Sequence, residues 1–171
     1  MLLALCNPAG AAELFGKVVG IADGDTITIV DNTYRQHRIR LSAIDAPERR
    51  QAYGERAKRH LSALIGDKAV RVSWEKRDRY GRIVGRVFSS ICDRVRCRYE
   101  DAGLEQIRAG MAWHYRRYAR DQPAAERAAY AAVEQHARER RAGLWREPDP
   151  VPPWDFRSAG TSARQTSFAG E

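Results

Sequence analysis

The chain has 171 residues, of which 43% are hydrophobic, and it carries a formal net charge of +8 at pH 7. This length allows one domain with its own core, and the positive charge favours a polyanionic partner, although it also fits the general solubility of an arginine-rich chain. No stretch approaches the length of a membrane span, and no segment pairs a strong apolar face with a lysine-lined polar face, so a membrane role is disfavoured.

The first twelve residues resemble a processing segment. An apolar run from Leu2 to Cys6 is followed by the small residues Gly10, Ala11 and Ala12, as at a signal-peptide cleavage site. We therefore expect residues 1–12 to be a signal peptide or its remnant and the protein to be exported, periplasmic or secreted, rather than cytoplasmic. A frayed terminus is the alternative, because no Lys or Arg precedes the apolar run.

The cysteines agree with export. Loss of Cys6 with the leader leaves Cys92 and Cys97 as an even pair that flanks residues 93–96. In a hairpin loop these two thiols could face each other at bridging distance, which makes them a candidate disulfide, and the alternative is two free thiols near a turn. A metal site here is disfavoured, because the chain has no second Cys or His pair at ligand spacing.

Residues 14–146 read as one folded domain that starts with three strands. The predicted strands are Leu14–Ala22, Asp25–Val30 and Arg38–Ile44, with turns at Asp23-Gly24 and Asp31-Asn32. Asp25 shares the alternation of Ile27 and Ile29, so it should point to the core side of its strand. Pro47 ends the third strand, because proline cannot donate to a strand ladder.

The second half of the domain adds helices and two more strands. The helices are predicted between Tyr53 and Gly66, Leu104 and Gly110, and Asp121 and Gly143, and the strands over Val70–Trp74 and Ile83–Ser89. This order predicts an α+β fold, the five-stranded Greek-key barrel called the OB-fold, with about three helices. Residues 147–171 form a proline-rich tail that becomes disordered past Arg157.

Residues 38–48 concentrate the chemistry-bearing side chains. Arg40, Asp45 and Glu48 place a guanidinium and two carboxylates around one strand end. Arginine suits a phosphate through its planar fork, and carboxylates suit a hard cation or a proton transfer, so phosphate-ester chemistry is indicated. Arg40 and Asp45 differ in strand alternation, so the chain must bend or bulge between them to bring both to one site.

Six motifs in order resemble the staphylococcal (micrococcal) nuclease family, also called thermonuclease-like nucleases. They are Asp23-Gly24-Asp25-Thr26, residues 40–48, Tyr53-Gly54, residues 78–82, residues 110–113 and residues 143–145. The resemblance covers roughly Phe15 to Trp145. It implies a Ca²⁺-dependent nuclease that hydrolyses DNA and RNA with little sequence preference, by direct attack of water and cleavage of the 5′ O–P bond to leave 3′-phosphates. It further implies a preference for single strands, a monomer and no obligate protein partner.

The resemblance also assigns roles that make physical sense. Asp25, Asp45 and the backbone carbonyl of Ala46 would bind one Ca²⁺ ion, although other divalent cations suit these ligands too, and the family usually has Thr at the position of Ala46. Glu48 would orient or deprotonate the attacking water. Arg40 and Arg82 would hold the phosphate and stabilise the charge that develops on it. Taken singly, each of these residues could as well form a surface salt bridge.

Substrate contacts are expected from aromatic and basic residues near the site. The candidates are Arg79, Tyr80, Tyr115 and Tyr118. Aromatic faces among positive charges suit single-stranded nucleic acid, whereas Trp113 is expected to pack in the core. By ungapped counting Arg116 stands where the family has a tyrosine, so the base pocket should differ.

Two other functions compete with the nuclease hypothesis. A non-catalytic OB-fold that binds nucleic acid would not need clustered carboxylates, which repel phosphate. A phosphodiesterase for a smaller substrate would not need the basic surface around Arg116 and Arg117.

Overall fold

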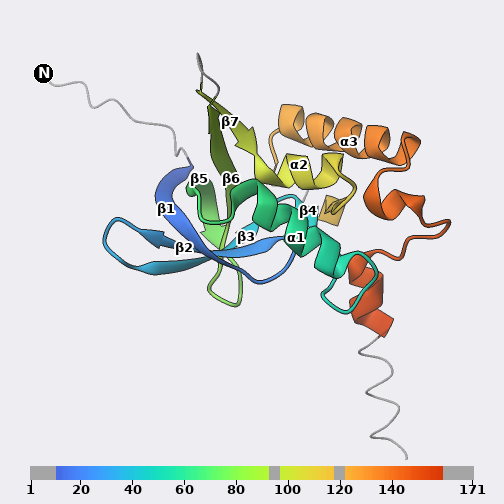
Figure 1. Cartoon of the computed structure of the whole chain (residues 1–171), viewed down its shortest axis with the longest axis horizontal. Helices are drawn as coiled ribbons and strands as arrows, with labels where there is room; N and C mark the ends of the chain where they lie inside the picture. Colours follow the sequence, from blue (N-terminus) through green and yellow to red (C-terminus); the bar gives the residue numbers. More distant parts are fainter. Residues whose placement is uncertain (1–10, 93–96, 118–121, 160–171) are drawn as a thin grey trace, which may run out of the picture.

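The computed structural model describes residues 11–92, 97–117 and 122–159. A six-stranded sheet has the order β3-β2-β1-β5-β6-β7, and an additional parallel pairing of β3 with β6 closes five of its strands into a barrel (Figure 1). The strands of this sheet are β1 (Ala12–Ile21), β2 (Thr26–Asp31), β3 (Gln36–Leu41), β5 (Ala69–Arg77), β6 (Ile83–Cys92) and β7 (Cys97–Asp101). The expected α+β OB-fold is therefore confirmed.

The barrel interior is formed by branched aliphatic side chains that alternate along the strands. Ile27 and Ile29 of β2, Ile39 and Leu41 of β3, and Val72 of β5 are all buried. Alternation places every second side chain of a strand on one face, so these residues fill the closed sheet and leave their neighbours outside.

Three helices pack beside the barrel. They are α1 (Gly54–Ile65), α2 (Ala102–Arg108) and α3 (Ala124–Glu139), and α2 lies between the other two (Figure 1). Ala57, Leu61 and Ile65 recur at helical spacing along α1 and are fully buried, so this face seals the barrel. No helix in the described part of the chain has the length and apolarity to cross a membrane.

A small aromatic cluster forms a second core. A two-stranded sheet of β4 (Ile44–Asp45) and β8 (Trp113–His114) leads into it, and the short 3₁₀ helix η2 (Gly143–Arg146) closes it. Trp113 and Trp145 pack edge to face with their centroids 4.3 Å apart, and Trp113 is only 7% exposed. Trp113 is thus a core residue, as expected from the sequence.

The predicted strand Arg38–Ile44 is in fact two strands. β3 ends at Leu41, Ala43 adopts a left-handed φ of 65°, and β4 begins at Ile44. This turn supplies the bend between Arg40 and Asp45 that the alternation of side chains requires. Arg40 and Asp45 can therefore reach the same point in space.

The C-terminal segment differs from its prediction. Its prolines indicated an extended chain, but residues 153–159 are helical, which adds a fourth helix to the three expected. Proline is compatible with the first turn of a helix, where its missing N–H has no partner to lose, and Pro153 stands at that point.

Some predictions fall on residues outside the described ranges. They include most of the proposed leader (1–12), the residues between the two cysteines, and the end of the tail. Cys92 and Cys97 face each other in the backbone register of β6 and β7, which is compatible with the predicted disulfide. The bridge itself stays a prediction.

Candidate active site

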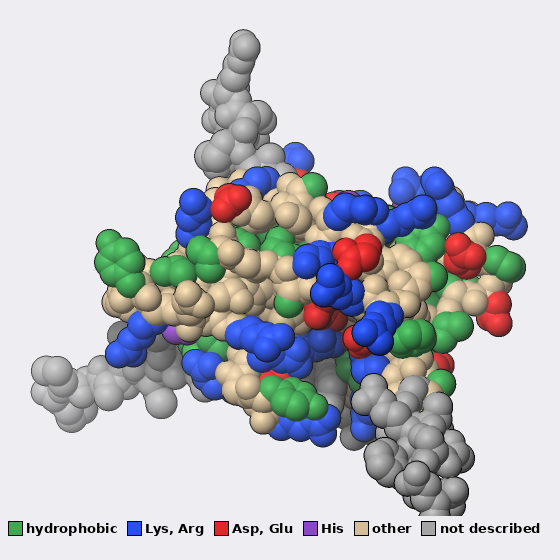
Figure 2. Space-filling view, turned by 60° about the horizontal axis from the view of Figure 1, so that its bottom comes forward, with side chains coloured by type: hydrophobic (Ala, Val, Ile, Leu, Met, Phe, Trp, Pro, Cys, Tyr) green, Lys and Arg blue, Asp and Glu red, His purple; other side chains and the backbone are tan. Residues whose placement is uncertain are grey.

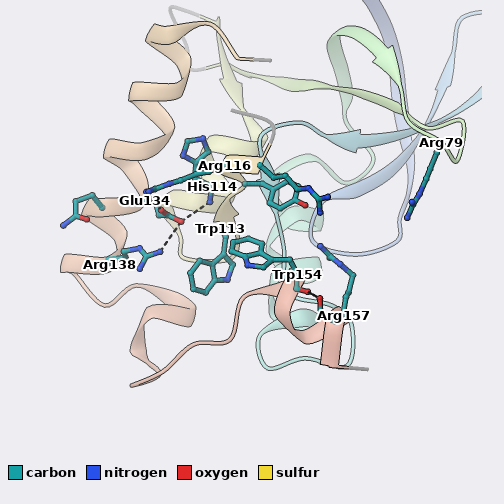
Figure 3. Close-up of a pocket in the computed structure, with 12 residues that line it drawn as sticks. Arg79, Trp113, His114, Arg116, Glu134, Arg138, Trp154 and Arg157 are labelled. Atoms are coloured by element: carbon teal, nitrogen blue, oxygen red, sulfur yellow. Dashed lines mark hydrogen bonds and ion pairs between the residues drawn. The ribbon is translucent and has the colours of Figure 1, made fainter. Parts of the chain in front are cut away.

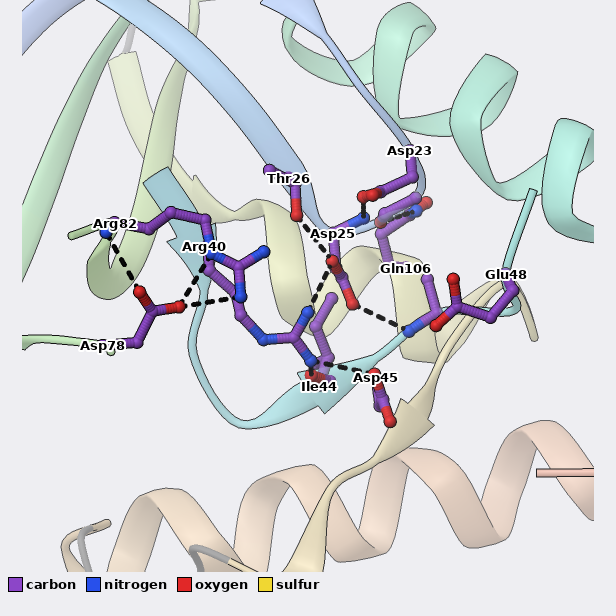
Figure 4. Close-up of polar contacts among 12 residues, drawn as sticks. Asp23, Asp25, Thr26, Arg40, Ile44, Asp45, Glu48, Asp78, Arg82 and Gln106 are labelled. Atoms are coloured by element: carbon purple, nitrogen blue, oxygen red, sulfur yellow. Dashed lines mark hydrogen bonds and ion pairs between the residues drawn. The ribbon is translucent and has the colours of Figure 1, made fainter. Parts of the chain in front are cut away.

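Arg40 is the centre of a cluster of charges at the end of β3. Its Nη1 donates to Asp25 Oδ1 at 2.9 Å and its Nη2 donates to Asp45 Oδ1 at 2.8 Å (Figure 4). One guanidinium therefore holds two carboxylates that are 20 residues apart in the sequence, since Asp25 directly precedes β2 and Asp45 belongs to β4. Both carboxylates are buried, with exposed fractions of 3% and 0%.

Asp25 is fixed by its neighbours on all sides. Its Oδ1 also accepts from the Thr26 hydroxyl at 2.9 Å, and its Oδ2 accepts the backbone N–H of Ala46 at 3.0 Å. Burial raises the pKa of Asp25 above its ordinary value, and the Arg40 guanidinium opposes this rise. Asp25 is buried on the core side of the strand end, as its place in the alternation predicted.

Gly24 explains why the turn before Asp25 can approach residue 46 so closely. A Cβ at this position would lie 2.6 Å from the Ala57 Cβ and 2.7 Å from the Ala46 Cβ. Such distances are too short for any side chain, so only glycine lets α1 and the Asp45-Ala46 segment meet at the turn. The small residue at Ala46 is part of the same close approach.

Gln106 of α2 is a buried residue that anchors this turn, and sequence reasoning missed it. Its Nε2 donates to the carbonyls of Gly24 at 2.7 Å and Ala57 at 3.1 Å, and its Oε1 contacts His60 Nδ1 at 2.5 Å. A glutamine within a short helix gives no signal in a single sequence, because its partners come from the turn and from α1.

Arg82 reaches the site from the turn between β5 and β6. Its guanidinium forms a two-pronged contact with Asp78 Oδ2, at 2.7 Å from both Nε and Nη2. Burial disfavours the charged Asp78, but the hydrogen bonds from Arg82 outweigh it, so the pKa of Asp78 lies below its ordinary value. Figure 4 draws Asp78 and Arg82 on one side of Arg40, with Asp45 and Glu48 on the other.

The parallel pairing of β3 with β6 places Arg82 near Arg40. In this register Ile39 lies opposite Ile83 and Arg40 lies opposite Val84. Arg38 shares the strand face of Arg40 but is exposed at the outer end of β3. The family resemblance alone selected Arg40 rather than Arg38 as a site residue. The structure also separates the two arginines, because Arg40 contacts Asp25 and Asp45 whereas Arg38 is exposed.

Glu48 lies beyond Asp45 on the loop that leads to α1. Its backbone N–H donates to Gln51 Oε1 at 3.1 Å, and its side chain remains 39% exposed. A carboxylate that is half open to solvent can accept a proton from a water molecule, which a fully buried carboxylate cannot do as easily. Glu48 is therefore the most accessible acid of the cluster.

A cleft of about 940 Å³ is lined in part by Arg157, which contacts Asp45 and Glu48 (Figure 3). Its lining includes Arg79, Tyr115, Arg116, Arg117, Trp154 and Arg157. Aromatic rings among arginines are suited to stack bases and contact phosphates of a single strand. Of the predicted substrate contacts, Arg79 and Tyr115 line the cleft, Tyr80 is exposed next to Arg79, and Tyr118 lies outside the described residues.

Arg157 is the other residue that the sequence did not indicate. It comes from the helical C-terminal segment, and its guanidinium contacts Asp45 Oδ2 at 2.7 Å and Glu48 Oε1 at 2.6 Å. No pattern in the sequence indicates this residue, because it stands at the end of a proline-rich stretch that is predicted to be extended.

The carboxylates fit a hard divalent cation by their chemistry. Asp25, Asp45 and Glu48 offer only oxygen donors, which Ca²⁺ prefers, and Arg40 and Arg157 supply positive charge where such an ion would supply it. In the described ranges no cluster of three or more His, Cys, Asp or Glu side chains is already arranged to coordinate a metal. Asp25 and Asp45, with the carbonyl of Ala46, stay the predicted ligands.

Residues 38–147 match the family model described as staphylococcal nuclease homologue, which covers more than half of the chain. The chain belongs to the staphylococcal nuclease family. The resemblance inferred from the six motifs is thereby confirmed.

Relatives that are named as nucleases align with most of the chain. The chain is 38% identical over 152 residues to an uncharacterized endonuclease of Escherichia coli, which covers 88% of the chain and 89% of the relative. It is 37% identical over 153 residues to a micrococcal nuclease of Shigella flexneri, which covers 89% and 85%. An uncharacterized endonuclease of Haemophilus influenzae is 33% identical over 141 residues, which covers 82% and 71%. These relatives support a nuclease function and a nucleic-acid substrate.

Proposed function

We propose that this member of the staphylococcal nuclease family is a Ca²⁺-dependent endonuclease that hydrolyses DNA and RNA phosphodiester bonds with little sequence preference and favours single strands. The observation that carries the proposal is the convergence of Asp25, Arg40, Asp45 and Glu48 at one end of the barrel, beside an arginine-rich cleft. A protein that only bound nucleic acid would gain nothing from three carboxylates that repel phosphate at this point.

Each site residue has its own role in the proposed reaction. Asp25, Asp45 and the Ala46 carbonyl would hold one Ca²⁺, which supplies Lewis acidity to a phosphate oxygen. Glu48 accepts the proton of the water that attacks phosphorus as the P–O5′ bond breaks. The 5′ oxygen takes up a proton from solvent and leaves as a hydroxyl, and the other product carries a 3′-phosphate. Arg40 and Arg82 donate hydrogen bonds to the phosphate oxygens, where negative charge grows in the transition state.

Each arginine is held in place before substrate arrives. Arg40 is fixed by Asp25 and Asp45, and Arg82 is fixed by the two-pronged contact with Asp78. A donor that is already oriented needs no reorganisation at the moment of reaction, and this is the usual origin of electrostatic catalysis. Arg79, Tyr80, Tyr115 and Tyr118 would contact the flanking nucleotides.

Digestion of single-stranded DNA, duplex DNA and RNA with Ca²⁺, Mg²⁺ or a chelator tests this proposal. We expect wild type to cleave these substrates only with Ca²⁺. The cleavage rate of Glu48→Gln should be lower by about 10²-fold because the proton acceptor is removed, and that of Arg82→Ala should be lower by about 10²- to 10³-fold. The matched controls are Glu55→Gln and Arg38→Ala, both at exposed positions, and Glu55 is paired with Arg49 rather than with a residue of the charge cluster.

The outcomes separate the competing functions. Equal rates for wild type and Glu48→Gln would show that Glu48 does not activate water. Binding of oligonucleotides without cleavage under any cation would favour the non-catalytic OB-fold, and cleavage of dinucleotide esters only would favour a small-substrate phosphodiesterase.

We also propose that the protein is exported and acts as a monomer. The support for export is the apolar run of residues 2–6 followed by small residues, together with the opposed register of Cys92 and Cys97. Expression of the full chain in a bacterial host should place the product in the periplasm or medium, with a mass two hydrogens below that of the reduced form. A cytoplasmic, fully reduced product would contradict this proposal.

A further inference from the structure

The C-terminal segment 151–158 is docked on the candidate active site from two sides. The Trp154 ring packs against Trp113 and Tyr115, with centroid distances of 5.7 Å and 5.5 Å (Figure 3). On the other side, Gln51 Nε2 donates to the carbonyl of Val151 at 2.5 Å. The segment is thus held both by the aromatic cluster and by the loop that carries Glu48.

Gln51 connects this segment directly to Glu48. The same side chain that reaches Val151 accepts the backbone N–H of Glu48 at 3.1 Å through its Oε1. The backbone N–H of Gln51 also donates to the Glu48 carbonyl at 2.8 Å. A change in the position of residues 151–158 therefore acts on the loop that presents the proposed water-activating acid.

Arg157 brings a guanidinium onto the carboxylates themselves. Its Nη2 lies 2.7 Å from Asp45 Oδ2, and its Nη1 lies 2.6 Å from Glu48 Oε1 and 3.3 Å from Asp45 Oδ1. Arg40 already engages Asp45 Oδ1 at 2.8 Å, so both oxygens of this buried carboxylate carry an arginine.

The charge of the cluster depends on Arg157. The carboxylates of Asp25, Asp45 and Glu48 together with Arg40 alone have a formal charge of minus two, which a divalent cation would neutralise. With Arg157 in place the formal charge is only minus one. A cation bound directly to Asp45 would lie within a few ångströms of the Arg157 guanidinium, where like charges in a partly buried site repel strongly.

Arg157 is also the arginine that can leave. Its side chain is 42% exposed, against 20% for Arg40, and it stands on the last described helical turn of the chain. Withdrawal of a long, half-exposed side chain into water costs much less than removal of the buried Arg40 would.

We propose that Arg157 competes with a divalent cation for Asp45 and at the same time occupies Glu48, so that the C-terminal segment sets the cation concentration at which the site becomes loaded. This inference rests on the proposed cation-dependent nuclease function. It adds a residue of the chain itself that occupies the carboxylates until the cation displaces it.

Calorimetric titration with Ca²⁺ in the absence of nucleic acid tests the competition. We expect Arg157→Gln to bind Ca²⁺ more tightly than wild type, with a Kd lower on the order of tenfold, because one guanidinium no longer has to leave two carboxylates. Arg157→Lys keeps the charge but loses the fork, so its Kd should lie between the two. Arg146→Gln, at an exposed arginine of η2, is the matched control and should bind like wild type.

The results that would contradict the proposed competition can be told apart from those that would contradict the proposed nuclease function. An equal or weaker Ca²⁺ affinity of Arg157→Gln, with wild type still binding, overturns the competition and leaves the proposed nuclease intact. If the Ca²⁺ affinity of Arg157→Gln is equal to that of wild type and the variant also binds a thymidine oligonucleotide more weakly, Arg157 is a phosphate ligand and not a competitor. Absence of Ca²⁺ binding by wild type and all variants overturns the cation chemistry of the proposed function, and this inference with it.

Discussion

At the scale of single residues, the site is organised by ion pairs between arginines and acidic side chains. Arg40 is held by two aspartates and Arg82 by one, Asp78, which also accepts the backbone N–H groups of Tyr80 and Arg82 at 2.9 Å and 3.0 Å. Sequence reasoning selected the arginines from the family motif but assigned no role to Asp78. Its role is to fix the arginine that is proposed to meet the phosphate.

The Asp78 contact predicts a pH-dependent stability. The pKa of Asp78 is lowered in the folded protein, so its contribution is present above the unfolded pKa, near 3.9, and is lost as the pH falls through the lower folded value. Asp78→Asn should therefore cost about 1 kcal/mol of unfolding free energy at pH 7 and progressively less below about pH 4.

Urea unfolding of wild type and Asp78→Asn between pH 7 and pH 2.5 measures this difference. Asp67→Asn is the control, because Asp67 is exposed and has a left-handed φ of 57° that asparagine also tolerates. A stability difference for Asp78→Asn that stays constant across this range would contradict the assigned pairing.

At the scale of elements, the site depends on how α2 holds the turn before β2. Gln106 links Gly24 and Ala57 through its amide, and Gly24 can approach Ala46 and Ala57 only because it lacks a side chain. The carboxylate of Asp25 is therefore placed by a helix that lies about 80 residues further along the chain.

Replacement of Gln106 by leucine should weaken both the fold and the site. It leaves the buried carbonyl of Gly24 without its side-chain donor, which costs about 1–3 kcal/mol of unfolding free energy, and it removes an additional donor from the Ala57 carbonyl within α1. The loosened turn should also raise the Kd for Ca²⁺.

Denaturant unfolding and Ca²⁺ titration of Gln106→Leu check this expectation. Gln135→Leu is the matched control, since Gln135 is exposed on α3 and donates to Glu139, also on the surface, at 2.9 Å. The control should change stability by less than about 0.5 kcal/mol. Equal stabilities of the two variants would show that the Gln106 amide does not anchor the turn.

At the scale of the whole molecule, barrel closure and surface charge converge on the same place. Closure through β3 and β6 brings the turn of Arg82 to the end of the strand that carries Arg40. Arg79, Arg116 and Arg117 line the cleft next to Arg157. Lys and Arg side chains are also spread over the face shown in Figure 2, with fewer Asp and Glu side chains among them, so a polyanion meets a mainly positive surface. Such a field draws a nucleic acid toward the site and makes its binding sensitive to salt.

The sequence by itself determined the family, the order of most strands and of the three main helices, and the type of chemistry expected. Alternation marked the strands, helical spacing marked α1 to α3, and the motifs around Asp25, Arg40 and Arg82 pointed to one site. These signals are local, because each depends on residues that are neighbours along the chain. Even the bend at Ala43 followed from the opposite alternation of Arg40 and Asp45.

Only the tertiary structure decided which distant side chains meet at that site. Gln106 reaches the turn from α2, and Asp78 fixes Arg82. Arg157 contacts Asp45 and Glu48 from a segment that the sequence predicts to be an extended, proline-rich tail. No local pattern encodes these contacts, because each joins polar groups from elements that folding alone brings together. Burial then makes them decisive, since a charge or amide removed from water must find a partner wherever the fold supplies one.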